Sequence, residues 1–292
     1  PGWHAAVQRR HGGRRPHLHT ERADRCRPAR AQSGRRPISV RWVDVNKGDD
    51  MNPNYRSRLV ARELKAMDKS GQSYFAPAPP LEALRTVVSS AMTRIGQHQP
   101  VWDPLAPDRQ QISFIDIKRA YFNAKIDAEA KPVFVSLPPE DPEHDTMCAQ
   151  LVRHMCGARG AADGWQEEYP TTLISLGFRQ RESCPHVFWH NEKDICTSVY
   201  GDDFTSSGPC PALDWMEAAI ADQYDITVQP RIGPGPSDAK EGRSLNRVIR
   251  WMDDKIEYEA DPRQAERLIA ECGLDGDKIK GVATPRCQAN VP

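Results

Sequence analysis

Residues 195–207 read Ile-Cys-Thr-Ser-Val-Tyr-Gly-Asp-Asp-Phe-Thr-Ser-Ser, two short uncharged segments on either side of Gly201, Asp202 and Asp203. Glycine and aspartate favour tight turns, because glycine adopts left-handed backbone angles and the aspartate side chain bonds to the turn itself. The stretch therefore predicts a β-hairpin whose tip carries two adjacent carboxylates.

A second apolar segment, residues 112–117, contains another carboxylate, Asp116, near its end. If this strand and the hairpin belong to one antiparallel sheet, three carboxylates meet at one edge. Oxygen ligands of this kind suit Mg²⁺. Two such ions about 3.5–4 Å apart can activate an attacking oxygen and stabilise a leaving group. Paired aspartates at a hairpin tip are also ordinary turn chemistry, so spacing leaves a catalytic and a structural role open.

The other expected elements mix helices and strands without a strict strand–helix–strand alternation, which favours an α+β fold over a doubly wound sheet. The helices are recognised by apolar residues at spacings of three and four, the strands by short apolar runs between turn formers. Expected helices cover 81–95, 163–176, 213–224 and 262–272, and expected strands cover 55–66, 112–117, 132–137, 195–207 and 248–258.

Charge is distributed unevenly along the 292 residues, although the total is zero. Residues 1–40 hold ten Arg and two acids, a net of +8, so the remainder carries −8. This segment lacks an apolar period and is expected to be a disordered tail, either a basic arm that touches nucleic acid or a badly bounded segment. The acidic remainder means that nucleic-acid binding would depend on local basic patches.

The chain has no apolar run of about 18 residues and no signal-peptide pattern, so neither a membrane span nor secretion is expected. None of its eight Cys forms a Cys-x-x-Cys pair, which favours free thiols in a reducing compartment. A zinc site and ordinary packing are the two interpretations of one loose cluster, whose spacing matches no common zinc pattern. Its members are His144, Cys148, His154 and Cys156.

Four blocks between about Trp42 and Pro285 are similar to motifs of one family. Residues 55–62 (Tyr-Arg-Ser-Arg-Leu-Val-Ala-Arg) are similar to Tyr-Lys-Ala-Arg-Leu-Val-Ala-Arg, and residues 116–124 to Asp-Val-Lys-x-Ala-Phe-Leu-x-Gly. Residues 200–203 are similar to Tyr-x-Asp-Asp, and residues 283–285 to Ser-Thr-Pro. In this order and spacing, the chain resembles the reverse-transcriptase domain of copia-type long-terminal-repeat retrotransposons.

The resemblance implies a right-hand polymerase with a palm built on an antiparallel sheet, fingers and part of a thumb. After the tail, residues 41–292 would form the reverse-transcriptase domain. Its fingers would cover about 41–100 and 131–160, and its palm about 101–130 and 161–230. A hairpin and a helix on the palm or thumb side would cover 231–292.

The resemblance also implies roles in metal binding. Asp116 and Asp202 would be the main ligands of two Mg²⁺ ions, or Mn²⁺, with Asp203 beside them and the Ile117 carbonyl contributing. Tyr121 would lie beneath the incoming sugar, where its ring leaves no room for a 2′-hydroxyl; a plain core aromatic is the alternative.

Basic residues would bind the substrate phosphates. Arg58 and Arg62 would grip the triphosphate, because guanidinium groups suit phosphate oxygens, although a solvated strand face explains them equally well. Arg159 stands where the family has a lysine and would also contact the substrate. The partners would be an RNA or DNA template with its primer and deoxynucleoside triphosphates. The expected location is cytoplasmic, in a virus-like particle, or nuclear.

One block departs from the family. Where relatives have Leu-Tyr-Gly-Leu-Lys-Gln-Ala-Pro-Arg-x-Trp, residues 155–165 read Met-Cys-Gly-Ala-Arg-Gly-Ala-Ala-Asp-Gly-Trp. Gly157, Ala161 and Trp165 match, while Gly160 and Asp163 replace a Gln and an Arg. A lost template-positioning Gln, and negative charge near a phosphate channel, put rate and fidelity in doubt.

Three functions remain to be weighed. The first is an active RNA-directed DNA polymerase, and the second is a catalytically degenerate relic that keeps the fold and binds nucleic acid weakly. The third, a metal-dependent nuclease, ranks low because no His stands near the three acids in sequence. The ribonuclease H and integrase domains of such a polyprotein are expected as partners but are absent from this sequence, which therefore suggests a fragment or a decayed copy.

Overall fold

The computed structural model describes residues 20–23, 33–49, 51–64, 78–93, 103–127, 129–259 and 262–274. Its centre is a six-stranded sheet of order β11-β4-β10-β9-β8-β7, in which every neighbouring pair is antiparallel. In the described part of the chain, no helix combines the length and apolar character that crossing a membrane requires. The strands are β4 (Gln110–Ile117), β7 (Arg179–Gln180), β8 (Val187–His190), β9 (Ile195–Tyr200), β10 (Asp203–Pro209) and β11 (Ile226–Val228).

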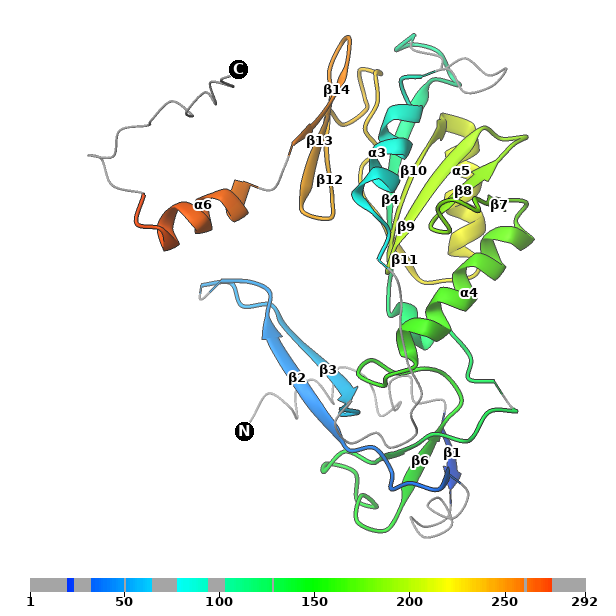
Figure 1. Cartoon of the computed structure of the whole chain (residues 1–292), viewed down its shortest axis with the longest axis vertical. Helices are drawn as coiled ribbons and strands as arrows, with labels where there is room; N and C mark the ends of the chain where they lie inside the picture. Colours follow the sequence, from blue (N-terminus) through cyan, green and yellow to red (C-terminus); the bar gives the residue numbers. More distant parts are fainter. Residues whose placement is uncertain are drawn as a thin grey trace, which may run out of the picture.

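Helices cover both faces of this sheet (Figure 1). α4 (Ala161–Ser175) and α5 (Cys210–Ala221) pack on one face through the largest apolar cluster, which includes Ile115, Ile117 and Phe204 from the sheet. α3 (Leu81–Ser90) packs on the opposite face, where its buried stripe meets Ile112 and Phe114. Because side chains alternate along a strand, the odd-numbered residues of β4 face α4 and α5, and the even-numbered ones face α3.

A small three-stranded sheet lies on the α3 side. It consists of β12 (Glu241–Ser244), β13 (Arg247–Trp251) and β14 (Ile256–Glu259), paired in that order. Gly242 allows β12 to approach the central sheet, since a Cβ there would lie 2.5 Å from the Phe114 ring. The Thr205 and Ser244 hydroxyls bond across the same junction at 3.0 Å.

A separate group of strands lies at the other end of the molecule (Figure 1). β2 (Val40–Asn46) and β3 (Tyr55–Ala61) form a hairpin, and β1 (Thr20–Ala23), β6 (Cys148–Leu151) and β5 (Phe134–Ser136) form a sheet. The short 3-10 helix η2 (Ala120–Phe122) follows β4, and α6 (Pro262–Glu271) follows β14.

The sequence predicted the type of most elements and misplaced some ends. The mixed α/β architecture with mostly antiparallel sheets is confirmed. The predicted tail needs correction at two places, because residues 20–23 pair with β6 and Ile38 is buried against β5. Residues 1–19, 24–32 and 275–292, which include the Ser-Thr-Pro-like block, lie outside the described residues. β1, β2, β6, β7, β8, β11, β12 and the short helix η2 were not predicted.

Candidate active site

The strand register brings two of the predicted acids directly opposite one another. Asp203, the first residue of β10, pairs with Asp116 near the end of β4. Directly opposed residues point to the same face of a sheet, which here is the α3 face that also carries Phe114. Asp203 also pairs with Tyr200, so Gly201 and Asp202 form a two-residue turn at the same edge. Three carboxylates therefore gather at one end of the central strands.

The electrostatics of these acids reflect their proximity. Burial, followed by the charges of Asp202 and Asp116, raises the pKa of Asp203 from 3.8 to about 6. Burial, followed by the charge of Asp202, also raises the pKa of Asp116. Like charges in a partly desolvated site oppose ionisation, so this edge concentrates negative potential that a cation would relieve.

Two hydrogen bonds hold the turn that carries Asp202. The Ile117 N–H donates to the Asp202 carbonyl at 2.9 Å. The Trp165 indole N–H donates to the Gly201 carbonyl at 2.7 Å, and its ring is 1% exposed. Gly201 has φ +63°, a left-handed angle that suits glycine. The Ile117 side chain is buried against α4 and α5, which leaves its backbone as the part available to the site.

Arginines on β3 contribute positive potential to this edge. Burial and the charge of Asp202 raise the pKa of Asp116, and Lys118, then Arg56 and Arg58, act in the opposite direction. Both arginines are exposed and lie two residues apart on β3, hence on one face of the hairpin. Sequence analysis missed Arg56, although the alternation Tyr-Arg-Ser-Arg in a predicted strand was the signal that pairs it with Arg58.

Tyr121 lies close to the turn, on η2. Burial, then the charges of Asp202 and Cys156, raises the pKa of its hydroxyl. The ring also packs partly against the core beneath the sheet. Tyr121 thus borders both the carboxylate edge and the core, and both predicted interpretations keep support.

Arg62 and Arg159 occupy a neighbouring junction. Arg62 is exposed just beyond β3, and its backbone N–H donates to the Ser39 carbonyl. Arg159 is half-buried, and its backbone N–H donates to the Glu63 carboxylate at 2.9 Å. Both residues therefore lie where β3 meets the segment before α4.

A pocket of about 610 Å³ opens beside Asp203. It runs along β10 and β4 to the β12–β13 turn, where Leu245 and Asn246 have positive φ. Arg243 and Arg263 add positive charge to its wall. This pocket connects the carboxylate edge with the three-stranded sheet, a link that no sequence motif indicated.

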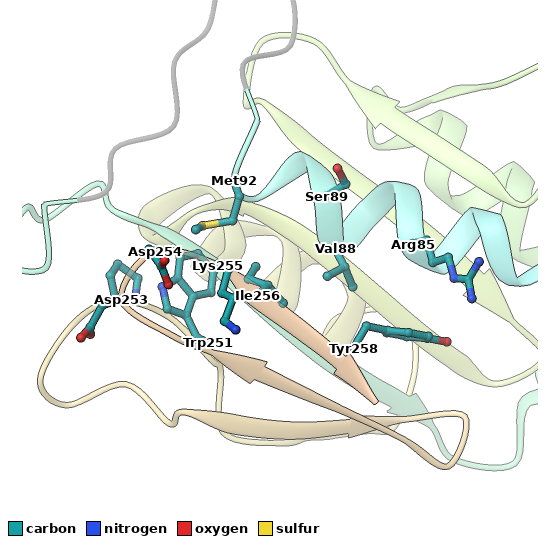
Figure 2. A pocket seen from close by; sticks show the side chains of 11 residues that line it. Arg85, Val88, Ser89, Met92, Trp251, Asp253, Asp254, Lys255, Ile256 and Tyr258 are labelled. Atoms are coloured by element: carbon teal, nitrogen blue, oxygen red, sulfur yellow. The ribbon is translucent and has the colours of Figure 1, made fainter. Parts of the chain in front are cut away.

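A second groove, of about 790 Å³, lies between α3 and the β13–β14 hairpin (Figure 2). Arg85 stands over the Tyr258 ring, 5.7 Å from its centroid, at one end, and Met92 and Trp251 lie at the other. None of the predicted site residues lines this groove, so it is distinct from the carboxylate edge.

Candidate metal ligands lie at two places, the carboxylate edge and the cluster of His144, Cys148, His154 and Cys156. Within them, no group of three or more His, Cys, Asp or Glu side chains stands ready to hold a metal ion. Of the residues in the possible zinc cluster, Cys148 is buried in β6, and burial lowers the pKa of His154. Asp116, Asp202 and Asp203 fit a divalent cation in donor chemistry and in the edge they share, and ligating a common ion requires their side chains to converge further.

The sequence matches one family profile over most of its length. Residues 29–229, more than two thirds of the chain, match the profile of the family described as reverse transcriptase (RNA-dependent DNA polymerase). The chain belongs to the reverse transcriptase family. No curated protein matches the sequence significantly.

The match to the reverse transcriptase family includes all three carboxylates and the block 155–165. β12, β13, β14 and α6 lie beyond it, so the pocket wall formed by Arg243 and Arg263 is outside the matched region. Inside the divergent block, one Asp163 oxygen is buried without a hydrogen-bond partner. A buried carboxylate oxygen without a hydrogen bond is destabilising, so Asp163 is a destabilising feature of this block.

Proposed function

We propose that this chain is an RNA-directed DNA polymerase of a copia-type retrotransposon. The observation that carries the proposal is the register that sets Asp203 opposite Asp116, with Asp202 in the intervening turn. The six-stranded sheet with α4 and α5 would be the palm, and the β2–β3 hairpin with β5 and β6 would belong to the fingers. The three-stranded sheet and α6 would form the thumb side.

The reaction joins the primer 3′-oxygen to the α-phosphorus of a deoxynucleoside triphosphate. The bond to the departing pyrophosphate breaks, and the 3′-hydroxyl loses its proton. Asp116, Asp202 and Asp203, with the Ile117 carbonyl, would hold two divalent cations. When bound, such ions supply charge neutralisation at the attacking and leaving oxygens. The chain contributes mainly orientation, because phosphoryl transfer depends largely on positioning and electrostatic stabilisation.

The surrounding residues would select and hold the nucleotide. Arg58 and Arg62, together with Arg159, would bind the triphosphate, and the exposure of Arg58 on β3 leaves its guanidinium accessible. Tyr121 would exclude a 2′-hydroxyl, which its position beside the Asp202 turn supports. The template would be RNA or DNA, and the location would be a cytoplasmic virus-like particle or the nucleus.

A primer-extension assay on an RNA template tests the proposal. We expect Mg²⁺-dependent incorporation by the wild-type chain and a loss of at least about 10³-fold in Asp202→Asn, since one ligand charge disappears. Asp108→Asn, at an exposed position in the loop before β4, serves as the control and should retain activity. Equal incorporation by Asp202→Asn and wild type would exclude this site.

The second candidate is a relic that keeps the fold and binds nucleic acid weakly. The buried, unpartnered oxygen of Asp163 favours it, because that side chain replaces a family arginine and is imperfectly accommodated. This candidate predicts no incorporation from a folded wild-type preparation with either Mg²⁺ or Mn²⁺. Weak binding to a primer–template would nevertheless persist.

A further inference from the structure

The segment from Cys156 to Trp165 touches both halves of the proposed site. At its start, the Ala61 N–H donates to the Cys156 carbonyl at 2.8 Å, and the Glu63 N–H to the Gly157 carbonyl at 3.3 Å. At its end, Trp165 donates to the Gly201 carbonyl. One short stretch therefore bonds to the end of the arginine-bearing strand β3 and to the turn that carries the carboxylates.

Both ends of this segment are tightly packed. Gly157 has φ +84°, and a Cβ there would lie 2.1 Å from the Ala61 carbonyl oxygen, so a side chain is excluded. Trp165 is enclosed by Tyr169 and Tyr224, with ring centroids 5.7 and 5.4 Å away. An enclosed indole has little freedom to follow a moving turn, so its N–H restrains the Gly201 carbonyl rather than adapting to it.

We propose that Cys156–Trp165 is a bracket that sets the position of the carboxylate turn relative to β3, and that Trp165 is a positioning residue for Asp202 and Asp203. Trp165 acts through the Gly201 carbonyl and touches no substrate. The inference rests on the proposed function for its catalytic consequence, whereas the restraint on the turn is a property of the fold.

A matched control separates positioning from core stability. Tyr224 belongs to the same aromatic cluster, and its hydroxyl is 2.5 Å from the hydroxyl of Thr172 on α4. Tyr224→Phe thus removes one enclosed hydrogen bond without touching Gly201. Trp165→Phe removes the indole donor, and benzothienylalanine at position 165 replaces the N–H by sulfur while keeping the ring volume, in case the phenylalanine variant does not fold.

Hydrogen exchange followed by mass spectrometry measures the restraint directly. In the full chain without substrate, we expect exchange in the peptide spanning 199–204 to rise about tenfold when the indole N–H is removed. The same peptide should exchange at the wild-type rate in Tyr224→Phe, even if both variants melt at similarly lowered temperatures. Unchanged exchange at 199–204 in the folded position-165 variants overturns the inference.

Primer extension supplies the second measurement. Removing the indole N–H should lower kcat about tenfold with KM for the nucleotide within about twofold, because the carboxylates shift while triphosphate binding on β3 is kept. A retained wild-type kcat overturns the inference. An inactive wild type with raised exchange at 199–204 in the position-165 variants would support the restraint and refute the proposed polymerase function, so the two failures are distinguishable.

Discussion

We expect Asp203→Asn to stabilise the protein above neutral pH in the absence of divalent cations. The pKa of Asp203 is about 6 instead of 3.8 because the site is partly buried and shared with Asp202 and Asp116. A folded-state pKa above the unfolded value means that stability from this group is present at acid pH and lost as the pH rises through about 6. Above that value, the ionised carboxylate opposes folding, and asparagine removes the charge.

The size of the effect follows from the same values. A pKa difference of about two corresponds to a ceiling of about 3 kcal/mol. Asp203 is only half-buried, and solvent screening reduces the expected gain to about 1 kcal/mol. For a chain of this length, that gain raises Tm by about 3 °C.

Thermal unfolding at pH 4 and pH 8, in chelator, measures the difference between Asp203→Asn and wild type. The two proteins should melt together at pH 4 and separate at pH 8, with the gap closing as Mg²⁺ is added. The exposed control Asp108→Asn should change the free energy of unfolding by less than about 0.5 kcal/mol at either pH. A variant that is less stable than wild type at pH 8, or a gap independent of pH, would refute the electrostatic reasoning.

Three further outcomes are expected. Gly157→Ala should destabilise the fold by about 3 kcal/mol in urea, because its Cβ would meet the Ala61 carbonyl at a positive φ. Asp238→Ala should cost about 3–5 kcal/mol, since it strips the Arg109 guanidinium, the Gln111 amide and the Gly235 N–H of their acceptor. Arg109 holds the pKa of Asp238 below 3.8, so this contribution should persist in wild type until the pH falls below about 4. Tyr121→Val should reduce discrimination against ribonucleotides about 10- to 100-fold in competitive primer extension, and unchanged discrimination would favour the core-aromatic interpretation.

Local patterns in the sequence predicted the elements that carry the site. The turn chemistry of Gly201 and Asp202 predicted the hairpin, and the apolar run before Asp116 predicted β4. The sequence predicted that these strands are neighbours only on the condition that they share one sheet. The register of Asp203 with Asp116 shows that they do. Pairing partners 87 positions apart depend on long-range packing, which a short pattern cannot encode.

The missed features are those in which tertiary contacts override local composition. β1 lies in an arginine-rich stretch with no apolar period, and its strand character comes from pairing with β6. β7 and β11 are two and three residues long, too short for a periodic signal. The bond from Trp165 to Gly201 joins a helix to a turn 36 residues later, so no spacing rule could have indicated it.

The bracket Cys156–Trp165 combines departures from the family motif with contacts that hold the carboxylate turn and β3 together. Within residues 155–165, only Gly157, Ala161 and Trp165 match the motif quoted above. The contacts to the end of β3 and to the carboxylate turn use backbone atoms of Cys156, Gly157 and Arg159 and the indole of Trp165, so Gly157 and Trp165 are the positions where the residue type matters. The retained positions set where the carboxylate turn and β3 lie, and the altered ones would change what the site contacts. We therefore expect any loss of catalysis to come from altered substrate contacts rather than from a failure to assemble the carboxylate edge. If the edge is intact, Gly160→Gln, which restores the motif residue, should raise nucleotide incorporation.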